Sequence, residues 1–316
     1  MRINDFHHWL SRATELTPSQ LDQTLSLFGK QQQKAIVVAT LSERNHCCPH
    51  CGHDDIKRWG NAHGLPRYRC GVCHKTFNAL TGTPLARLRH REHWGQYSQA
   101  LIDGLSVRKA ARHCGIHKDT AFRWRHRFLI AIAAAEPTRL QGIVEADETY
   151  FLESHKGERH LSRPARKRGG KASKRGLSSE QIPVLIARDR SRETLDAVLP
   201  KANTQSVSEV LGSILDSDAV LCSDANPIYR AFTKKAHLEH RSINLSTGVR
   251  VQGHAFHIQN VNAYDSRLKG WMCRFRGVAT KYLPNYLGWR RCIEKYSGEL
   301  STQVMLTQAL GVMINT

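Results

Sequence analysis

Four cysteines near the start of the chain have the spacing of a structural zinc site. Cys48 and Cys51 form one Cys-x-x-Cys pair, Cys70 and Cys73 form a second, and 18 residues separate the two pairs. Each Cys-x-x-Cys turn presents two sulfurs to one metal, so two turns joined by a hairpin complete a tetrahedral Zn²⁺ shell. The segment between them has short strand patterns and Gly-containing turns. It predicts a zinc ribbon whose site is structural, because no coordination position stays open.

Two alternatives remain open for this segment. His46 and Cys47 lie directly before Cys48, and either could replace it as a ligand, although the regular spacing favours Cys48. A Cys-x-x-Cys pair can also take part in thiol exchange, but two pairs at ribbon spacing are not needed for that reaction. We therefore expect structural zinc on the two Cys-x-x-Cys pairs. Because so short a hairpin has almost no core, we expect the metal to supply much of its folding energy.

A second set of side chains has the chemistry of metal-dependent phosphodiester cleavage. That chemistry needs carboxylates that converge from different elements on two Mg²⁺ ions. Asp147 lies in GIVEADETYF, whose strand alternation puts Glu145 on the same face and Glu148 on the opposite one. Asp224 ends the apolar stretch AVLCSD, before the turn NPIYRAF. A carboxylate in that position is either a helix cap or a metal ligand, and Asp224 alone would more often be a cap.

The third group is expected from a helix in HIQNVNAYDSRLKGW. Asn262 and Lys269 are seven residues apart, two helical turns, so they share a face with Asp265 between them. An amide oxygen can coordinate Mg²⁺, but it adds no negative charge and cannot act as a base. Asp265 is therefore an alternative third ligand. More remote candidates are three glutamates: Glu145, Glu148 and Glu294.

Two further features of this region have more than one interpretation. His257, just before the expected helix, is more plausible as a structural hydrogen-bonding residue than as a ligand. In the run RFRGVATKYLPNYLGWRR, the basic residues could contact DNA. The spacing of Tyr282, Tyr286 and Trp289, four and then three residues, instead favours packing of the last helix onto the sheet.

A helix-turn-helix is predicted between the two sites. In GLSVRKAARHCGIHKDTAFRWRHRFL, Ser106 begins a first helix and Gly115 lies in the turn. The second helix, at about residues 118–128, has an apolar stripe and suits the major groove of DNA. Its expected exposed basic residues are Lys118, Arg123, Arg125 and Arg127. Ordinary helical hairpins share the small residues and the turn glycine, so the DNA role depends on the zinc ribbon and the basic chain around it.

The charge of the chain predicts a polyanionic partner. The 316 residues include 47 Lys and Arg against 27 Asp and Glu, a formal charge of +20. Each phosphate that Lys or Arg neutralises releases a condensed counterion, so DNA is the natural partner, and a ribosomal or generally basic protein is the plain alternative. Residues 154–181 are rich in Gly, Ser, Lys and Arg and lack apolar side chains that would order them. This basic loop is either a solvated linker or a segment that orders on DNA phosphate, through Arg166, Lys167 and Arg168.

The elements that position these residues divide the chain into four parts. Residues 1–45 are expected to be helical, with Thr17 as a cap and leucines that pack; residues 46–80 form the ribbon and residues 81–140 the helix-turn-helix region. Residues 141–316 alternate apolar strands with helical windows, which predicts an α/β domain. No stretch reaches the roughly 18 apolar residues of a membrane helix, and the start lacks the apolar centre of a signal peptide. We therefore expect a cytoplasmic protein without a membrane partner.

From the ribbon to Trp289 the chain resembles the zinc-ribbon DDE transposases of bacterial insertion sequences, whose catalytic domain has an RNase H-like fold. The matching pieces are VEADETYF, LCSDANPIYRAF and HIQNVNAYDSRLKGW. The resemblance implies that Asp147 and Asp224 are the metal-binding carboxylates. It aligns Asn262 with a position at which most of the family has Glu, although one subgroup has Asn there. It also implies that Lys269 contacts a DNA phosphate.

The resemblance also implies an activity and its partners. The expected function is Mg²⁺- or Mn²⁺-dependent cleavage of DNA ends followed by strand transfer, with recognition of terminal inverted repeats and target DNA. Pairing of two ends implies a homo-oligomer on DNA, and the expected location is the bacterial nucleoid. The alternatives are a zinc-dependent DNA-binding regulator and a domesticated, catalytically inactive copy.

Overall fold

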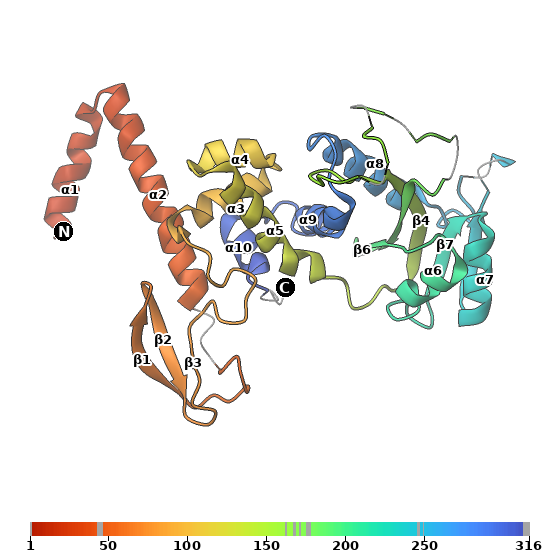
Figure 1. Ribbon diagram of the computed structural model, residues 1–316, viewed down its shortest axis with the longest axis horizontal. Coiled ribbons are helices and arrows are strands. Elements are labelled where there is room, and N and C mark those ends of the chain that lie inside the picture. The colour runs from red at the N-terminus through yellow and green to blue at the C-terminus, as the bar shows by residue number, and fades with distance from the viewer. Residues whose placement is uncertain are drawn as a thin grey trace. The chain divides into compact units, whose positions relative to one another are not determined.

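The computed structural model describes residues 2–42, 47–161, 163–166, 169–170, 172–174, 178–244, 247–248 and 250–311. The chain divides into two compact units. Unit 1 comprises Met1–Trp124 and Ser301–Thr316, and unit 2 comprises Arg125–Leu300. Figure 1 shows the elements of both units.

Unit 1 begins with two helices, α1 (Ile3–Ser11) and α2 (Pro18–Ser42). The N–H of Gln20 donates to Thr17 Oγ1 (3.4 Å), so the predicted start of α2 is confirmed. The last turns of α2 bury Val37 and Leu41 and contact α3 (Trp94–Ile102) and α10 (Thr302–Ala309). The expected packing of its first leucines is not observed: Leu21, Leu25 and Leu27 are 44–59% exposed.

The cysteine segment folds as a three-stranded antiparallel sheet in the order β1-β2-β3. The strands are β1 (Ile56–Ala62), β2 (Leu65–Cys70) and β3 (Thr76–Phe77). Its core is small, because Phe77 is buried with two of the cysteines and stacks on Tyr68 with ring centroids 5.8 Å apart. So small a core agrees with a hairpin that depends on bound metal for its stability.

The helix-turn-helix consists of α4 (Val107–Cys114) and α5 (Lys118–Ala134). Ser106 Oγ accepts the N–H of Lys109 (3.4 Å), and Gly115 ends α4 with a φ of 64°, a left-handed conformation that favours glycine. The start and the turn are therefore as predicted, whereas α5 continues six residues beyond Phe128. Helix α5 passes from unit 1 into unit 2 between Trp124 and Arg125. Helix α10, from the part assigned by sequence to the α/β domain, contacts α2 and α3 of unit 1.

Unit 2 is built on a five-stranded mixed sheet in the order β6-β5-β4-β7-β8. Strands β4, β5 and β6 form an antiparallel meander, while β7 and β8 run parallel to β4. The strands are β4 (Ile143–Leu152), β5 (Gln181–Asp189), β6 (Thr194–Val198), β7 (Val220–Asp224) and β8 (Glu239–Ile243). This arrangement confirms the predicted α/β, RNase H-like class.

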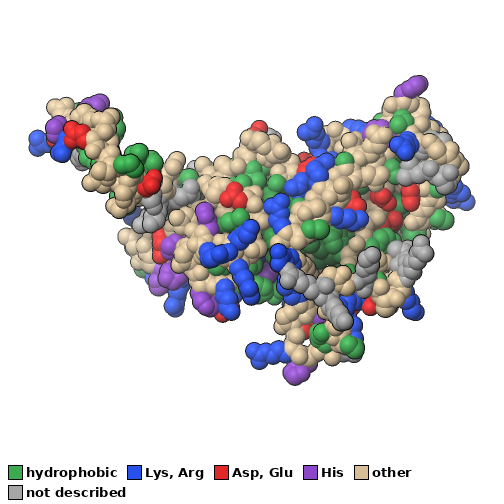
Figure 2. Space-filling view, turned by 90° about the horizontal axis from the view of Figure 1, so that it is seen from above, with side chains coloured by type: hydrophobic (Ala, Val, Ile, Leu, Met, Phe, Trp, Pro, Cys, Tyr) green, Lys and Arg blue, Asp and Glu red, His purple; other side chains and the backbone are tan. Residues whose placement is uncertain are grey.

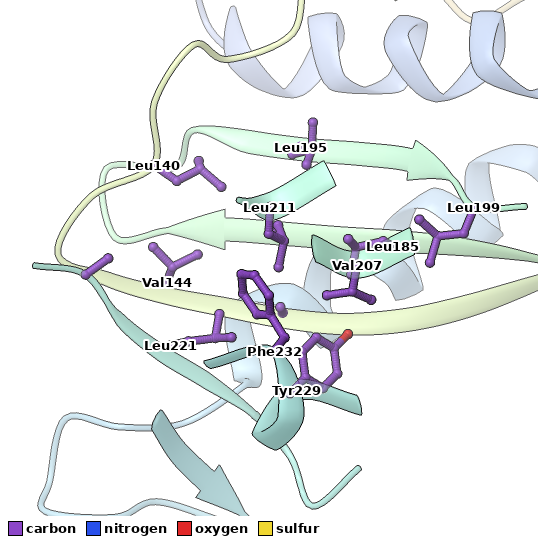
Figure 3. Packing of buried hydrophobic residues seen from close by; sticks show 13 residues of the cluster. Leu140, Val144, Leu185, Leu195, Leu199, Val207, Leu211, Leu221, Tyr229 and Phe232 are labelled. Atoms are coloured by element: carbon purple, nitrogen blue, oxygen red, sulfur yellow. The ribbon is translucent and has the colours of Figure 1, made fainter. Parts of the chain in front are cut away.

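Helices cover both faces of this sheet, and the alternation of β5 shows why. Leu185 and Ala187 point into a cluster with α6 (Thr204–Leu211) and α7 (Pro227–Ala236), the packing drawn in Figure 3. Val184 and Ile186 point into a second cluster, with α8 (Gln259–Cys273) and α9 (Leu283–Lys295). A strand buried on both sides places neighbouring residues in different cores. The catalytic candidates lie on the α8 side.

No helix within the described ranges is long and apolar enough to cross a membrane.

Candidate active site and zinc centre

The four predicted cysteine ligands come together in unit 1. The ligand sulfurs of Cys48, Cys51, Cys70 and Cys73 all lie within 4.8 Å of one another. The Cys48–Cys73 and Cys51–Cys70 Sγ pairs are each 3.6 Å apart. That is far longer than a disulfide, and it agrees with the separation of about 3.8 Å expected for two thiolates bound tetrahedrally at Zn–S distances of about 2.3 Å.

The backbone around the cluster favours thiolates. The N–H of Cys73 donates to Cys70 Sγ (3.4 Å) and lowers the pKa of the Cys70 thiol to about 7. The N–H of His50 donates to Cys48 Sγ in the same way (3.4 Å). Cys47 is exposed and is not part of the four-sulfur cluster, and His46 lies outside the described residues. The chemistry of this donor set fits Zn²⁺.

Asp147 and Asp224 occupy matching positions on two neighbouring parallel strands of unit 2: Asp147 lies within β4, and Asp224 is the last residue of β7. Ala146 of β4 pairs with Ser223 of β7, and the two aspartates directly follow this pair. Matching positions on parallel strands point to the same face of the sheet. The N–H of Glu148 donates to Asp147 Oδ1 (2.8 Å), and the N–H of Asn226 donates to Asp224 Oδ1 (3.0 Å). Asp224 therefore begins the turn into α7 and also presents a carboxylate at the carboxyl end of β7.

Burial and negative neighbours make Asp147 hard to ionise. Burial and, after it, the charges of Asp224 and Asp265 together raise its pKa to about 6, against the lowering effects of the Glu148 N–H and of Lys269. Two carboxylates that repel each other in a partly buried place are stabilised when a divalent cation binds between them. Carboxylate oxygens are the ligands that Mg²⁺ and Mn²⁺ prefer. The donor set therefore fits such a cation.

Helix α8 brings the third candidate position to the same region. Lys269 Nζ donates to Asp265 Oδ2 (2.8 Å), and both side chains affect the pKa of Asp147 electrostatically. This face of α8 is thus directed toward Asp147. Asn262 shares that face one turn before Asp265, and its side chain is exposed. Among the described residues, the four cysteines are the one group of His, Cys, Asp or Glu side chains already close enough together to hold a metal ion, and the three aspartates do not form such a group.

The remote glutamates have other partners. Glu294 forms ion pairs with three arginines, Arg188, Arg267 and Arg290. Glu148 points to the α7 side, where Asn226 Nδ2 donates to it (3.5 Å). Burial and, to a lesser extent, the charges of Asp147 and Asp224 raise the pKa of Glu148 to about 7. Glu145 is buried at the start of α8.

Two protein-family models match parts of the chain. Residues 139–290, which span β4 to α9, match the ISXO2-like transposase domain. Residues 87–131, which span α3 to most of α5, match a homeodomain-like domain.

The chain carries an ISXO2-like DDE transposase domain.

One protein and one solved structure match most of the chain. One is the "Uncharacterized protein in transposable element ISH50" of Halobacterium salinarum, 26% identical over 295 residues, which are 90% of this chain and 99% of that protein. The other is a structure described as "Crystal structure of a pre-cleavage Mos1 transpososome", with 11% identity over 69% of this chain and 79% of that one. Its TM-score of 0.19 is too low to support a structural argument. The family match confirms the predicted DDE-type transposase domain.

In Figure 2, Lys and Arg side chains are spread in several small groups over the face shown, between side chains of other types. Of the four basic candidates on α5, Lys118 and Arg123 are exposed and Arg127 is partly buried. Arg125 is fully buried, with its guanidinium 4.5 Å from the centroid of the Trp289 ring. The expectation that Arg125 is exposed was wrong, because its guanidinium packs on Trp289 of α9, and this part of α5 also contacts α9 at His126 and Ala133.

The basic loop is partly held within the transposase domain. Arg166 donates to the carbonyl of Glu153 (2.5 Å) and to Glu180 Oε1 (2.7 Å), and Arg166 lowers the pKa of Glu180 to about 2. Lys156 Nζ donates to the carbonyl of Gly277 (2.8 Å). The described part of the loop is therefore more ordered than composition predicted. Lys167 and Arg168 lie outside the described residues.

Packing explains the aromatic run at the end of the domain. Tyr286 and Trp289 are buried against Trp271 and Phe275, with ring centroids 4.7–6.3 Å apart. The interpretation as packing residues is confirmed for these two. His257 is a hydrogen-bonding residue, as expected, with its Nδ1 3.2 Å from Glu145 Oε1.

Proposed function

We propose that this chain cuts DNA at the ends of an insertion sequence in a reaction that requires Mg²⁺ or Mn²⁺, and then joins the freed 3′ end to target DNA. The observation that carries the proposal is the placement of Asp147 and Asp224 at neighbouring strand positions, with the Lys269 face of α8 in electrostatic reach. Both aspartates lie within the part of the chain that matches the ISXO2-like transposase domain, and their carboxylates are suited to bind a divalent cation.

Each side chain has a separate role in this proposal. Asp147 and Asp224 hold the cation, and Asn262 adds a neutral amide oxygen, with Asp265 as the alternative. When bound, the cation stabilises the charge on the attacking and leaving oxygens of an in-line displacement. The pKa of Asp147 is raised to about 6, so a fraction of the molecules is protonated at this carboxyl near neutral pH. In that fraction, Asp147 must release its proton before it can bind a cation. Lys269 binds a DNA phosphate once it leaves Asp265.

DNA recognition is assigned to unit 1. The zinc ribbon and the helix-turn-helix recognise the terminal inverted repeats, and Lys118 and Arg123 supply exposed positive charge at the start of α5. The basic loop, with Arg166, Lys167 and Arg168, binds flanking or target DNA. Two ends must be held together for strand transfer, so the working complex is at least a dimer. Its place of action is the nucleoid in the cytoplasm.

Nicking of a labelled DNA end tests the proposal. The wild type is expected to nick the DNA with Mg²⁺ or Mn²⁺, and Asp147→Ala and Asp224→Ala are expected to lose the activity. Asp216→Ala is the matched control. Asp216 forms its ion pair with Arg139 and precedes the start of β7, whereas Asp224 lies at the end of that strand. Equal nicking by the wild type and Asp147→Ala would refute the catalytic assignment. DNA binding without nicking under any divalent cation would favour the regulator or the inactive copy.

A further inference from the structure

Glu145 is the most completely hydrogen-bonded carboxylate near the proposed active site. It is 1% exposed and accepts the backbone N–H groups of Asn260 (2.7 Å) and Val261 (3.0 Å) and the side-chain amide of Asn260 (2.8 Å). Arg190 Nη1 lies 2.6 Å from its Oε1, and His257 Nδ1 lies 3.2 Å from the same oxygen. Backbone N–H groups at the start of a helix and a positive charge therefore meet on one carboxylate.

This carboxylate supplies a cap that the sequence of α8 lacks. The residue before α8 is Ile258, which has no side-chain oxygen, and no side-chain cap bond is formed there. The first N–H groups of a helix need acceptors, and a negative charge at that end is favourable. Glu145 provides both from β4, a strand 115 residues earlier in the chain. Arg190 also donates to the carbonyl of Ala255 (2.8 Å), so the segment that leads into α8 is fixed as well.

The cap connects the two halves of the proposed site. Glu145 is two residues before Asp147, and strand alternation puts both side chains on the α8 face of β4. Asn260 is two residues before Asn262, in the first turn of α8. The separation between the strand that carries Asp147 and the helix turn that carries Asn262 is thus set by hydrogen bonds to one carboxylate.

We propose that Glu145 is a positioning residue, which holds the first turn of α8 and its Asn262 beside Asp147 for cation binding. This inference rests on the proposed function. A neutral third ligand contributes no charge to attract the cation, so its contribution depends on being placed correctly in advance. If only stability were required at this position, well-packed apolar side chains would serve equally well.

Iron-mediated backbone cleavage tests the positioning directly. Fe²⁺ is bound in place of Mg²⁺, hydroxyl radicals are generated with ascorbate and peroxide, and the fragments of unit 2 are mapped. The wild type is expected to be cut near Asp147, near Asp224 and in the first turn of α8. Glu145→Gln is expected to keep the first two cuts and to lose most of the third. It should also raise the Mg²⁺ concentration for half-maximal nicking roughly ten- to a hundredfold, the range typical of residues that orient metal ligands.

Matched variants separate positioning from general stability. Glu193→Gln removes an ion pair with Lys295 (2.8 Å) in the same unit, and it should leave the cleavage map unchanged. Asn260→Ala removes one donor to Glu145 and leaves the charge paired with Arg190, so it should give a weaker loss of the α8 cut even if Glu145→Gln fails to fold. An unchanged α8 cut in folded Glu145→Gln and in Asn260→Ala would overturn the inference while leaving the proposed function intact. If the wild type is not cut near Asp147 and Asp224, the proposed site itself fails, and this inference with it.

Discussion

Asp147→Asn should stabilise the protein while it abolishes cleavage. In the folded chain, burial and the charges of Asp224 and Asp265 raise the pKa of Asp147 to about 6, from an ordinary value near 3.8. The folded state therefore binds the proton more tightly than the unfolded chain does. The stability contributed by the protonated carboxyl is complete below the unfolded pKa and is lost as the pH rises through the folded pKa. An amide is neutral at every pH and keeps that stability.

The size of the effect follows from the shift. A difference of about two pKa units corresponds to about 3 kcal/mol, and interaction with the neighbouring carboxylates reduces what one substitution recovers to roughly 1–3 kcal/mol at pH 8. The Asn side chain keeps an oxygen to accept the N–H of Glu148. At pH 5 the gain should fall to about half, because part of the wild-type Asp147 is then protonated.

Urea unfolding at pH 8 and pH 5 measures this gain, with zinc supplied and no other divalent cation present. The matched control is Asp216→Asn: Asp216 forms an ion pair with Arg139, so losing its charge should not stabilise. Added Mg²⁺ should stabilise the wild type and not the variant, by about 2.7 kcal/mol at a hundred times the dissociation constant. A free energy of unfolding for Asp147→Asn that equals or falls below that of the wild type at pH 8 would show that Asp147 carries no electrostatic strain, and the reasoning would be wrong.

Three further predictions follow from the packing and charge of the two units. Cys51→Ser or zinc chelation should unfold the β1–β3 sheet and weaken DNA binding, seen as lost protection from hydrogen exchange in that segment alone; loss of protection in unit 2 as well would contradict a separate zinc module. Arg291→Met leaves the buried Asp196 carboxylate without its ion pair and should lower the free energy of unfolding by about 3–5 kcal/mol, whereas Lys295→Met on the exposed side should change it by less than about 1 kcal/mol; similar values in urea titrations would refute this. Arg123→Ala should weaken DNA binding and reduce its salt dependence by about one counterion, and Arg125→Ala should mainly lower stability; the reverse pattern in binding isotherms would be decisive against it.

Local patterns in the sequence were enough to predict the four-cysteine cluster and the main strands. The Cys-x-x-Cys spacing requires only that two turns meet, and the four sulfurs do meet. The alternation around Asp147 and the apolar stretch ending at Asp224 likewise depend on local structure, and register between parallel strands then brings the two aspartates together. These features could be predicted because the physical cause of each lies within a few residues of the chain.

Features that depend on distant partners could not be predicted in this way. Strand β8 has the sequence EHRSI, which is too polar to predict a strand from its own pattern. It forms an edge strand by pairing with β7. Arg125 looked like a DNA contact because its spacing on α5 is that of an exposed residue, and only Trp289, far along the chain, explains its burial. The contact of Arg166 with Glu180, which holds part of the basic loop, was likewise not indicated by the composition of that loop. Each of these is a basic or polar residue whose partner lies outside the local pattern.

Glu145 and Asp147 show most clearly what the fold adds to the sequence. They are two acidic residues on the same face of one strand, and nothing in GIVEADETYF separates their roles. The fold surrounds Glu145 with N–H donors and Arg190, which stabilise its charge in a buried position. It buries Asp147 beside two negative neighbours, which raises its pKa, and gives it one N–H donor, which lowers the pKa only in part. A fully compensated carboxylate is suited to hold structure, and an uncompensated one is suited to bind a cation. The different surroundings of the two carboxylates along β4 are therefore set by the helix and strands that pack against it, and we propose that the stability lost at Asp147 is what a bound divalent ion would recover.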